Sequence, residues 1–203
     1  MKTRMIACLW MLAAVSLMAQ DKPQNVLKNP GFEAKDGKND SLPADWGIFC
    51  EKGDPTAFKL VTENPKEGSQ ALKMGFDTSA AKFYGIGQRL PIKPGQSVTF
   101  TANFRNMSLR DETYVQISIE WINNADPKKE ISRSWGPTTK ATDVSTDSWK
   151  KFEVTAVAPP ESAEMNIVIT LFPVGSPDGA ILVDDLNVSV KDAVKPAAPP
   201  AAQ

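Results

Sequence analysis

The sequence predicts an all-β protein, a jelly-roll sandwich of two antiparallel sheets. From residue 25 to about residue 190, Gly, Pro, Asn and Asp recur at short intervals and separate runs rich in β-branched and aromatic residues. This arrangement is typical of strands joined by turns. No stretch after the N-terminal segment has the periodicity of an amphipathic helix. Many short strands, each with one apolar face, bury those faces by packing as two sheets.

Three runs alternate between apolar and polar side chains, as a half-buried strand does. The clearest is residues 113–122, where every second side chain is apolar: Val115, Ile117, Ile119 and Trp121. Residues 97–105 and 165–172 repeat the pattern. Further strands are expected at residues 57–61, 70–75, 83–90, 149–155 and 180–190.

The first 19 residues read as an export signal. Lys2 and Arg4 precede an apolar stretch, residues 5–18, which is too short to favour a membrane span. We expect cleavage after Ala19, although Ala14 to Ser16 fits the small-x-small rule better. A buried N-terminal helix and a lipidated Cys8 are the alternatives. The expected location is therefore secreted, periplasmic or on the surface of a bacterial cell.

The domain boundaries follow from the same composition. We expect one domain at residues 20–190, followed by an Ala- and Pro-rich tail at residues 191–203 that is disordered or serves as a tether. Without the signal, Cys50 is the single cysteine, so no intramolecular disulfide can form.

Composition also limits the chemistry. The formal net charge of -1 gives no electrostatic reason to expect nucleic acid or an anionic membrane as a partner. The chain has no histidine, which excludes Ser-His-Asp and Cys-His catalysis and the commonest zinc and copper sites.

Several motifs occur in the order found in one family. They are NVLKNPGFE at residues 25–33, Trp46, EGSQAL at 67–72, GQRL at 87–90 with KPGQ at 93–96, WKKF at 149–152, and VDDL at 183–186. Together they span residues 25 to about 190. The chain resembles carbohydrate-binding modules of families 4, 9, 16 and 22. The resemblance implies a galactose-binding-domain-like jelly roll, a glycan held on a concave sheet, and a structural calcium ion.

Sugars are bound by aromatic rings that stack on them and by polar groups that meet their hydroxyls. In the alternating runs, the side chains opposite the apolar face point outward. On one strand these include Tyr114, Gln116 and Glu120, and Arg105, Asn166 and Thr170 on other strands could face the same cleft. Phe49 and Tyr84 stand where the family often places aromatic platforms, although Gly85 and Gly87 would allow a bulge that reverses Tyr84. Trp135 is a possible platform in a rim loop. The alternative for each polar residue is an ordinary solvated strand face. Core positions are expected for Trp46, Trp121, Trp149 and Gln88.

Calcium binds six to eight oxygens from carboxylates and carbonyls. By resemblance, Glu33 and one of Asp184 or Asp185 would supply carboxylates, with Asp184 favoured. Gly31 and the segment at Ser69 and Gln70 would supply carbonyls. The alternative is that the two aspartates simply end an edge strand.

These observations predict a monomeric, non-catalytic module that binds polysaccharide or oligosaccharide. A jelly-roll glycoside hydrolase would need two carboxylates across the scissile bond, and only Glu120 has clear outward parity in mid-sheet. A surface adhesin or assembly protein with the same fold is the third possibility.

Overall fold

A computed structural model describes residues 24–51, 57–76, 82–109, 113–123, 125–126, 129–173 and 179–192. The predicted signal peptide, and the predicted tail from residue 193 onward, lie outside the described residues. The chain forms two five-stranded antiparallel sheets that pack face to face. This confirms the predicted all-β sandwich. No helix within the described ranges is both long and apolar enough to cross a membrane.

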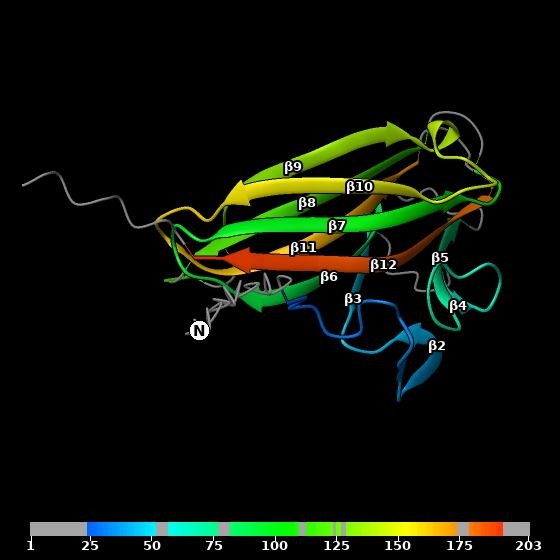
Figure 1. Cartoon of the computed structure of the whole chain (residues 1–203), viewed down its shortest axis with the longest axis horizontal. Coiled ribbons are helices and arrows are strands. Elements are labelled where there is room, and N and C mark those ends of the chain that lie inside the picture. The colour runs from blue at the N-terminus through cyan, green and yellow to red at the C-terminus, as the bar shows by residue number, and fades with distance from the viewer. Residues whose placement is uncertain are drawn as a thin grey trace, which may run out of the picture.

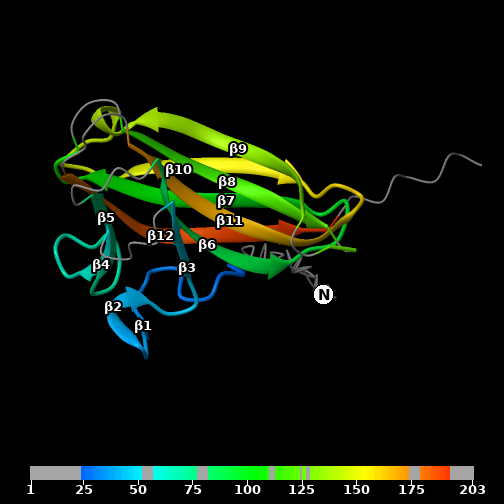
Figure 2. The same ribbon diagram turned by 180° about the vertical axis from the view of Figure 1, so that it is seen from behind.

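Sheet 1 faces the viewer in Figure 1. In spatial order its strands are β10 (Lys150–Val157), β7 (Ser97–Asn106), β12 (Gly179–Lys191), β5 (Ala71–Phe76) and β4 (Phe58–Val61). Sheet 2 faces the viewer in Figure 2. Its order is β3 (Gly47–Cys50), β6 (Tyr84–Pro91), β11 (Ser162–Phe172), β8 (Tyr114–Asn123) and β9 (Glu130–Lys140). A small hairpin, β1 (Lys35–Asp36) and β2 (Asn39–Pro43), lies beside them, and a 3-10 turn covers Ala141–Asp143.

The core lies between the sheets and is built from the alternating positions that the sequence predicted. The apolar side chains of β7, β8 and β11 at these positions are all at most 1% exposed: Val98, Phe100, Ala102, Phe104, Val115, Ile117, Ile119, Trp121, Met165, Ile167, Ile169 and Leu171. Burial of these faces on both sheets is the main driving force for the sandwich. Trp46 is also buried, whereas Trp149 is only half-buried.

Four strands were not predicted, namely β1, β2, β3 and β9. The first three are short. β9 is long, but it is an edge strand without apolar alternation, and it contains Gly136 and Pro137. A proline at a sheet edge costs no ladder hydrogen bond, so β9 tolerates a residue that argues against a strand in the sequence.

A bulge in β9 decides where Trp135 points. Gln116 of β8 pairs with Thr138, but Ser118 pairs with Trp135, so β9 has one residue more than β8 in this stretch. Because of the extra residue, Trp135 and Thr138 lie on the same face although three positions separate them. Trp135 therefore lies on a strand of sheet 2 and not in a rim loop.

Candidate functional site

Strand register aligns four polar side chains across the outer face of sheet 2. Arg89 of β6 pairs with Asn166 of β11, Asn166 with Glu120 of β8, and Glu120 with Arg133 of β9. Paired residues of neighbouring strands project from the same face. The four side chains therefore form one polar row perpendicular to the strands.

Two further rows lie beside the polar row, and each has an aromatic residue at one end. The first row is Gly47, Gly87, Val168, Ser118 and Trp135. The second row is Phe49, Gly85, Thr170, Gln116 and Thr138. Phe49 lies on the edge strand β3 and Trp135 on the opposite edge strand β9. Four strand spacings of about 4.8 Å place the two aromatic edges roughly 19 Å apart.

The aromatic group at the β3 edge rests on a glycine. A Cβ atom on Gly85 would lie 2.1 Å from Cζ of Phe49, so the ring lies directly over the Gly85 backbone. Phe83 stands beside it, with 6.2 Å between the ring centroids. Gly87 gives room in the same way to the side chain of Asn166, whose Oδ1 would be 3.0 Å from a Cβ there. The two glycines of β6 thus let neighbouring side chains lie flat on the sheet.

The polar row is held by a connected set of contacts. Asn166 Nδ2 donates to Glu120 Oε2 at 2.7 Å, and Arg133 Nη2 lies 2.5 Å from Glu120 Oε1. Arg133 also makes a two-point contact with Glu130, Nε to Oε1 at 3.0 Å and Nη2 to Oε2 at 2.8 Å. The hydrogen bond with Glu130 raises the pKa of Arg133 against the opposing effect of burial, and the charges of Glu120 and Glu130 add to it. Arg133 is therefore a permanent cation in this face.

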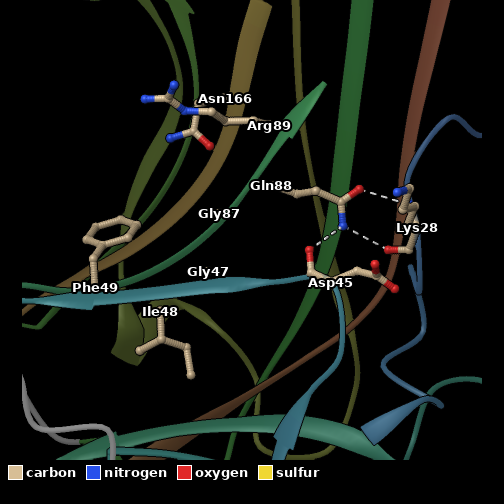
Figure 3. A pocket seen from close by; sticks show the side chains of 9 residues that line it. All are labelled: Lys28, Asp45, Gly47, Ile48, Phe49, Gly87, Gln88, Arg89 and Asn166. Atoms are coloured by element: carbon tan, nitrogen blue, oxygen red, sulfur yellow. Dashed lines mark hydrogen bonds between the residues drawn. The ribbon is translucent and has the colours of Figure 1, made fainter. Parts of the chain in front are cut away.

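A depression of about 360 Å³ opens beside β3 and β6 (Figure 3). Its lining includes Phe49, Gly87, Arg89 and Asn166, with Lys28 and Asp45 on the side where β3 begins. Gln88 also lines this depression, and Figure 3 shows it pointing toward Lys28 and Asp45 and away from Arg89 and Asn166. The side-chain amide of Gln88 is hydrogen-bonded to backbone groups. Oε1 accepts from Lys28 N at 2.8 Å, and Nε2 donates to the carbonyls of Lys28 and Asp45. This is the core role that its parity predicted.

Seven of the nine predicted carbohydrate-binding residues share the outer face of sheet 2. They are Phe49, Tyr114, Gln116, Glu120, Trp135, Asn166 and Thr170. Their accessibility differs. Trp135 is 55% exposed, whereas Thr170 is only 6% exposed and has little surface to offer a ligand. Gln116 Nε2 donates to Thr138 Oγ1, which ties it to the edge strand.

The other two predicted residues do not lie on this face. Tyr84 is 1% exposed and packs in the core, with its ring centroid 6.5 Å from that of Phe58. β6 pairs with β11 without a bulge, so Tyr84 keeps the inward parity of Ile86. Arg105 belongs to β7 of sheet 1, and its Nε donates to the carbonyl of Thr146 at 2.8 Å. Tyr84 and Arg105 were therefore wrongly predicted to face the ligand together with the residues of sheet 2.

Sequence reasoning missed Arg133, Glu130 and Arg89 on or beside this face. Arg89 has simple outward parity on a predicted strand and could have been found. Arg133 and Glu130 could not, because their strand was not predicted. Arg89 also forms a salt bridge with Glu164, with 3.5 Å between Nη1 and Oε2.

The residues predicted for calcium lie at the loops around Gly31, and the structure separates them into two groups. A Cβ on Gly31 would be 3.8 Å from Asp184 Oδ1 and 3.9 Å from Cγ of Glu33. Asp184 is completely buried, and its oxygens accept from the backbone N–H groups of Lys66, Glu67 and Asp185. Burial raises the pKa of Asp184 despite these hydrogen bonds. Among the described residues no salt bridge reaches Asp184, since Lys66 Nζ pairs with Asp185 instead, and a metal ion would match the charge of such a buried carboxylate.

Glu33 belongs with Asp184. Burial acts to raise the pKa of Glu33, but hydrogen bonds from the Ser69 hydroxyl and from the Ser69 and Gln70 backbone outweigh it, so the pKa is lowered. Glu33 therefore stays ionised beside Gly31.

Asp185 fits a metal ion less well, and Gln70, which was predicted to supply its main-chain carbonyl, has its side-chain amide engaged elsewhere. The Asp185 carboxylate pairs with Lys66 Nζ at 2.7 Å and accepts from Asn103, and the Gln70 side chain donates to the carbonyls of Phe32 and Glu33. In the part of the chain that the structure describes, no three His, Cys, Asp or Glu side chains are grouped to hold a metal by themselves. Main-chain oxygens would have to complete a site at Glu33 and Asp184.

Similar solved structures share the fold. A family 61 carbohydrate-binding module in complex with β-1,4-galactotriose superposes with a TM-score of 0.56 at 18% identity, over 83% of this chain and 99% of that one. The first family 22 module of a Paenibacillus barcinonensis protein, a xylan-binding domain, gives 0.53 at 13% identity, over 81% and 93%. The enzymatically active domain of a bacteriophage CBA120 tailspike gives 0.59 at 13% identity, over 82% of this chain and only 21% of the tailspike.

These identities show the fold alone, and they agree with the fold expected from the resemblance. No family model and no curated protein matches the chain.

Proposed function

We propose that this protein binds a polysaccharide without cleaving it, on the outer face of sheet 2. The observation that carries the proposal is that two aromatic side chains, Phe49 and Trp135, come from opposite edge strands of the same face. The polar row from Arg89 to Arg133 lies beside them. Rings at the two ends would stack on sugar faces while amide, carboxylate and guanidinium groups meet hydroxyls. The two edge strands lie four strand spacings, roughly 19 Å, apart, and the Phe49 ring reaches inward over Gly85 of β6, so the two rings suit an oligosaccharide segment better than a single sugar.

The similar modules support the ligand class. One was solved with β-1,4-galactotriose and another is a xylan-binding domain, and both cover most of this chain. An aromatic-free face would instead favour an adhesin or assembly protein of the same fold, and this face carries Phe49 and Trp135.

A hydrolase is the weaker candidate, although the structure adds a second carboxylate that the sequence reasoning did not find. Glu120 and Glu130 both contact Nη2 of Arg133, so the two carboxylates are close. In a glycosidase the scissile bond lies between the two carboxyl groups. Here the guanidinium of Arg133 occupies that space, and Asn166 takes the other oxygen of Glu120. This arrangement suits hydrogen bonding to a ligand.

Two further proposals come from the sequence. The N-terminal segment would export the protein, which would act as a monomer outside the cytoplasm. A structural calcium ion would be held by the carboxylates of Glu33 and Asp184, where it would neutralise the buried charge of Asp184 and join the N-terminal loop to β12.

Affinity electrophoresis of the purified chain tests the proposed function. Native gels would contain a xylan, a galactan, a glucan or a mannan, and each would be run with calcium and with a chelator. We expect retardation by at least one polysaccharide, with no release of reducing sugar from it. Free migration in all four would refute the proposal, and steady release of reducing sugar would favour the hydrolase.

A further inference from the structure

We propose that Arg133 is a positioning residue that connects the Trp135 platform to Asn166 through Glu120, so that the two halves of the face are held as one unit. The inference rests on the proposed glycan binding for its functional meaning. It rests on geometry for the connection itself.

The first contact fixes the ring. The guanidinium carbon of Arg133 lies 4.8 Å from the centroid of the Trp135 ring, within the range of a cation–π contact. Arg133 and Trp135 are two positions apart on β9, so they project from the same face. The guanidinium covers one face of the indole, which leaves the other face for a sugar.

The second contact fixes the guanidinium. Its Nε and Nη2 both bind the Glu130 carboxylate, and Nη2 also contacts Glu120 Oε1. The Arg133 side chain is only 25% exposed and that of Glu120 only 15%. A planar donor group held at two points has little freedom to turn, which a lysine ammonium could not reproduce.

The third contact orients the amide. Glu120 uses Oε1 for Arg133 and Oε2 for Asn166 Nδ2, at 2.7 Å. A carboxylate only accepts, so the Asn166 group that faces it must be the NH₂. The amide oxygen of Asn166, Oδ1, is therefore turned toward the space over Gly87, where it can accept a hydrogen bond from a sugar hydroxyl. Trp135, Arg133, Glu120 and Asn166 thus form one chain of contacts over β9, β8 and β11.

The test compares Arg133→Met, which keeps side-chain length but loses charge and hydrogen bonds, with Arg133→Lys, which keeps the charge. Glu153→Gln, on the exposed face of β10 in sheet 1, is the control for a charge change elsewhere. Thermal melts establish that all variants are folded. Two properties are then measured: affinity for the polysaccharide that retards the parent, and accessibility of Trp135 to acrylamide without any glycan. Subtracting the fluorescence of a Trp135→Phe partner in each background isolates the Trp135 signal from the other tryptophans.

We expect Arg133→Met to bind about three- to thirtyfold more weakly, with Trp135 more accessible to the quencher. Arg133→Lys should recover part of both losses, and Glu153→Gln should match the parent. Unchanged quenching of Trp135 in Arg133→Met would overturn the inference. If binding weakens while quenching stays the same, Arg133 contacts the ligand directly and has no positioning role. If the parent binds no polysaccharide, the proposed function fails, and the quenching result still decides whether Arg133 positions Trp135.

Discussion

The ring of Phe49 lies on the backbone of Gly85, so closely that a methyl group there would meet Cζ of the ring at 2.1 Å. The two residues are direct partners in the β3–β6 ladder. Gly85 therefore sets the height and tilt of the only aromatic side chain that β3 contributes to the outer face of sheet 2.

Gly85→Ala should weaken glycan binding while leaving the fold intact. The new methyl group displaces the far end of an edge-strand side chain, which is cheap, but it lifts the ring from its place. We expect affinity to fall roughly two- to tenfold, the size of a modest aromatic contact, with little change in melting temperature. Phe49→Ala should reduce affinity at least as much, and adding Gly85→Ala to it should have no further effect. Additive losses in the double variant would mean that Gly85 acts without Phe49.

Neighbouring positions on β8 should respond in opposite ways. Gln116→Ala changes an outward side chain and should lower affinity with little loss of stability. Ile117→Ala removes a completely buried side chain and should cost about 2 to 5 kcal/mol of unfolding free energy. Urea denaturation measures the second effect and affinity electrophoresis the first. Equal stability of the two variants would contradict the register.

The only two tyrosines of the chain form a similar pair. Tyr84→Ala empties a buried core position and should destabilise the protein by about 3 to 5 kcal/mol, by analogy with other buried aromatic residues. Tyr114→Ala, at the start of β8 on the outer face, should melt like the parent and bind glycan more weakly. A stable Tyr84→Ala variant with lost affinity would restore Tyr84 as a platform.

Calcium should raise the melting temperature. An ion that binds only the folded state raises the free energy of unfolding by about 2.7 kcal/mol when its free concentration is a hundred times its Kd. Glu33→Gln should remove most of this gain and melt close to the parent in chelator, because Glu33 is exposed and the amide oxygen can still accept from Ser69. Glu153→Gln serves as the control. Identical melting of the parent in calcium and in chelator would reject the metal site.

Most of the fold could be predicted because its central strands obey one rule. β7, β8 and β11 place an apolar side chain at every second position, and these side chains meet the opposite sheet. The edge strands β3 and β9 have a neighbour on one side only, and their apolar alternation is weaker. Gly136 and Pro137, which are unusual inside a strand, make β9 still harder to recognise. Burial helps a strand to be recognised in the sequence, so both edges of sheet 2 were missed, whereas β4 and β10 at the edges of sheet 1 carry enough apolar residues to be predicted.

The same limit applied to the candidate site. Gln116, Glu120 and Asn166 follow from parity on strongly patterned strands. Arg133 could not be predicted to join them, because its place depends on the pairing of β9 with β8 and on two irregularities in that ladder, one between Glu130 and Ser132 and one between Trp135 and Thr138. Tyr84 was misplaced for the opposite reason, since two glycines suggested a bulge that β6 does not contain.

Trp135 and Val157 give the most direct test of glycan binding on the outer face of sheet 2. Both are exposed apolar side chains, at 55% and 60%, but Trp135 belongs to sheet 2 and Val157 to sheet 1. The affinity of Trp135→Ala and Val157→Ala for the retarding polysaccharide would be measured beside the parent. Our account predicts about tenfold or greater loss for Trp135→Ala, as expected when a stacking ring is removed, and parent-like affinity for Val157→Ala. Full affinity in Trp135→Ala, or an equal loss in both variants, would contradict it.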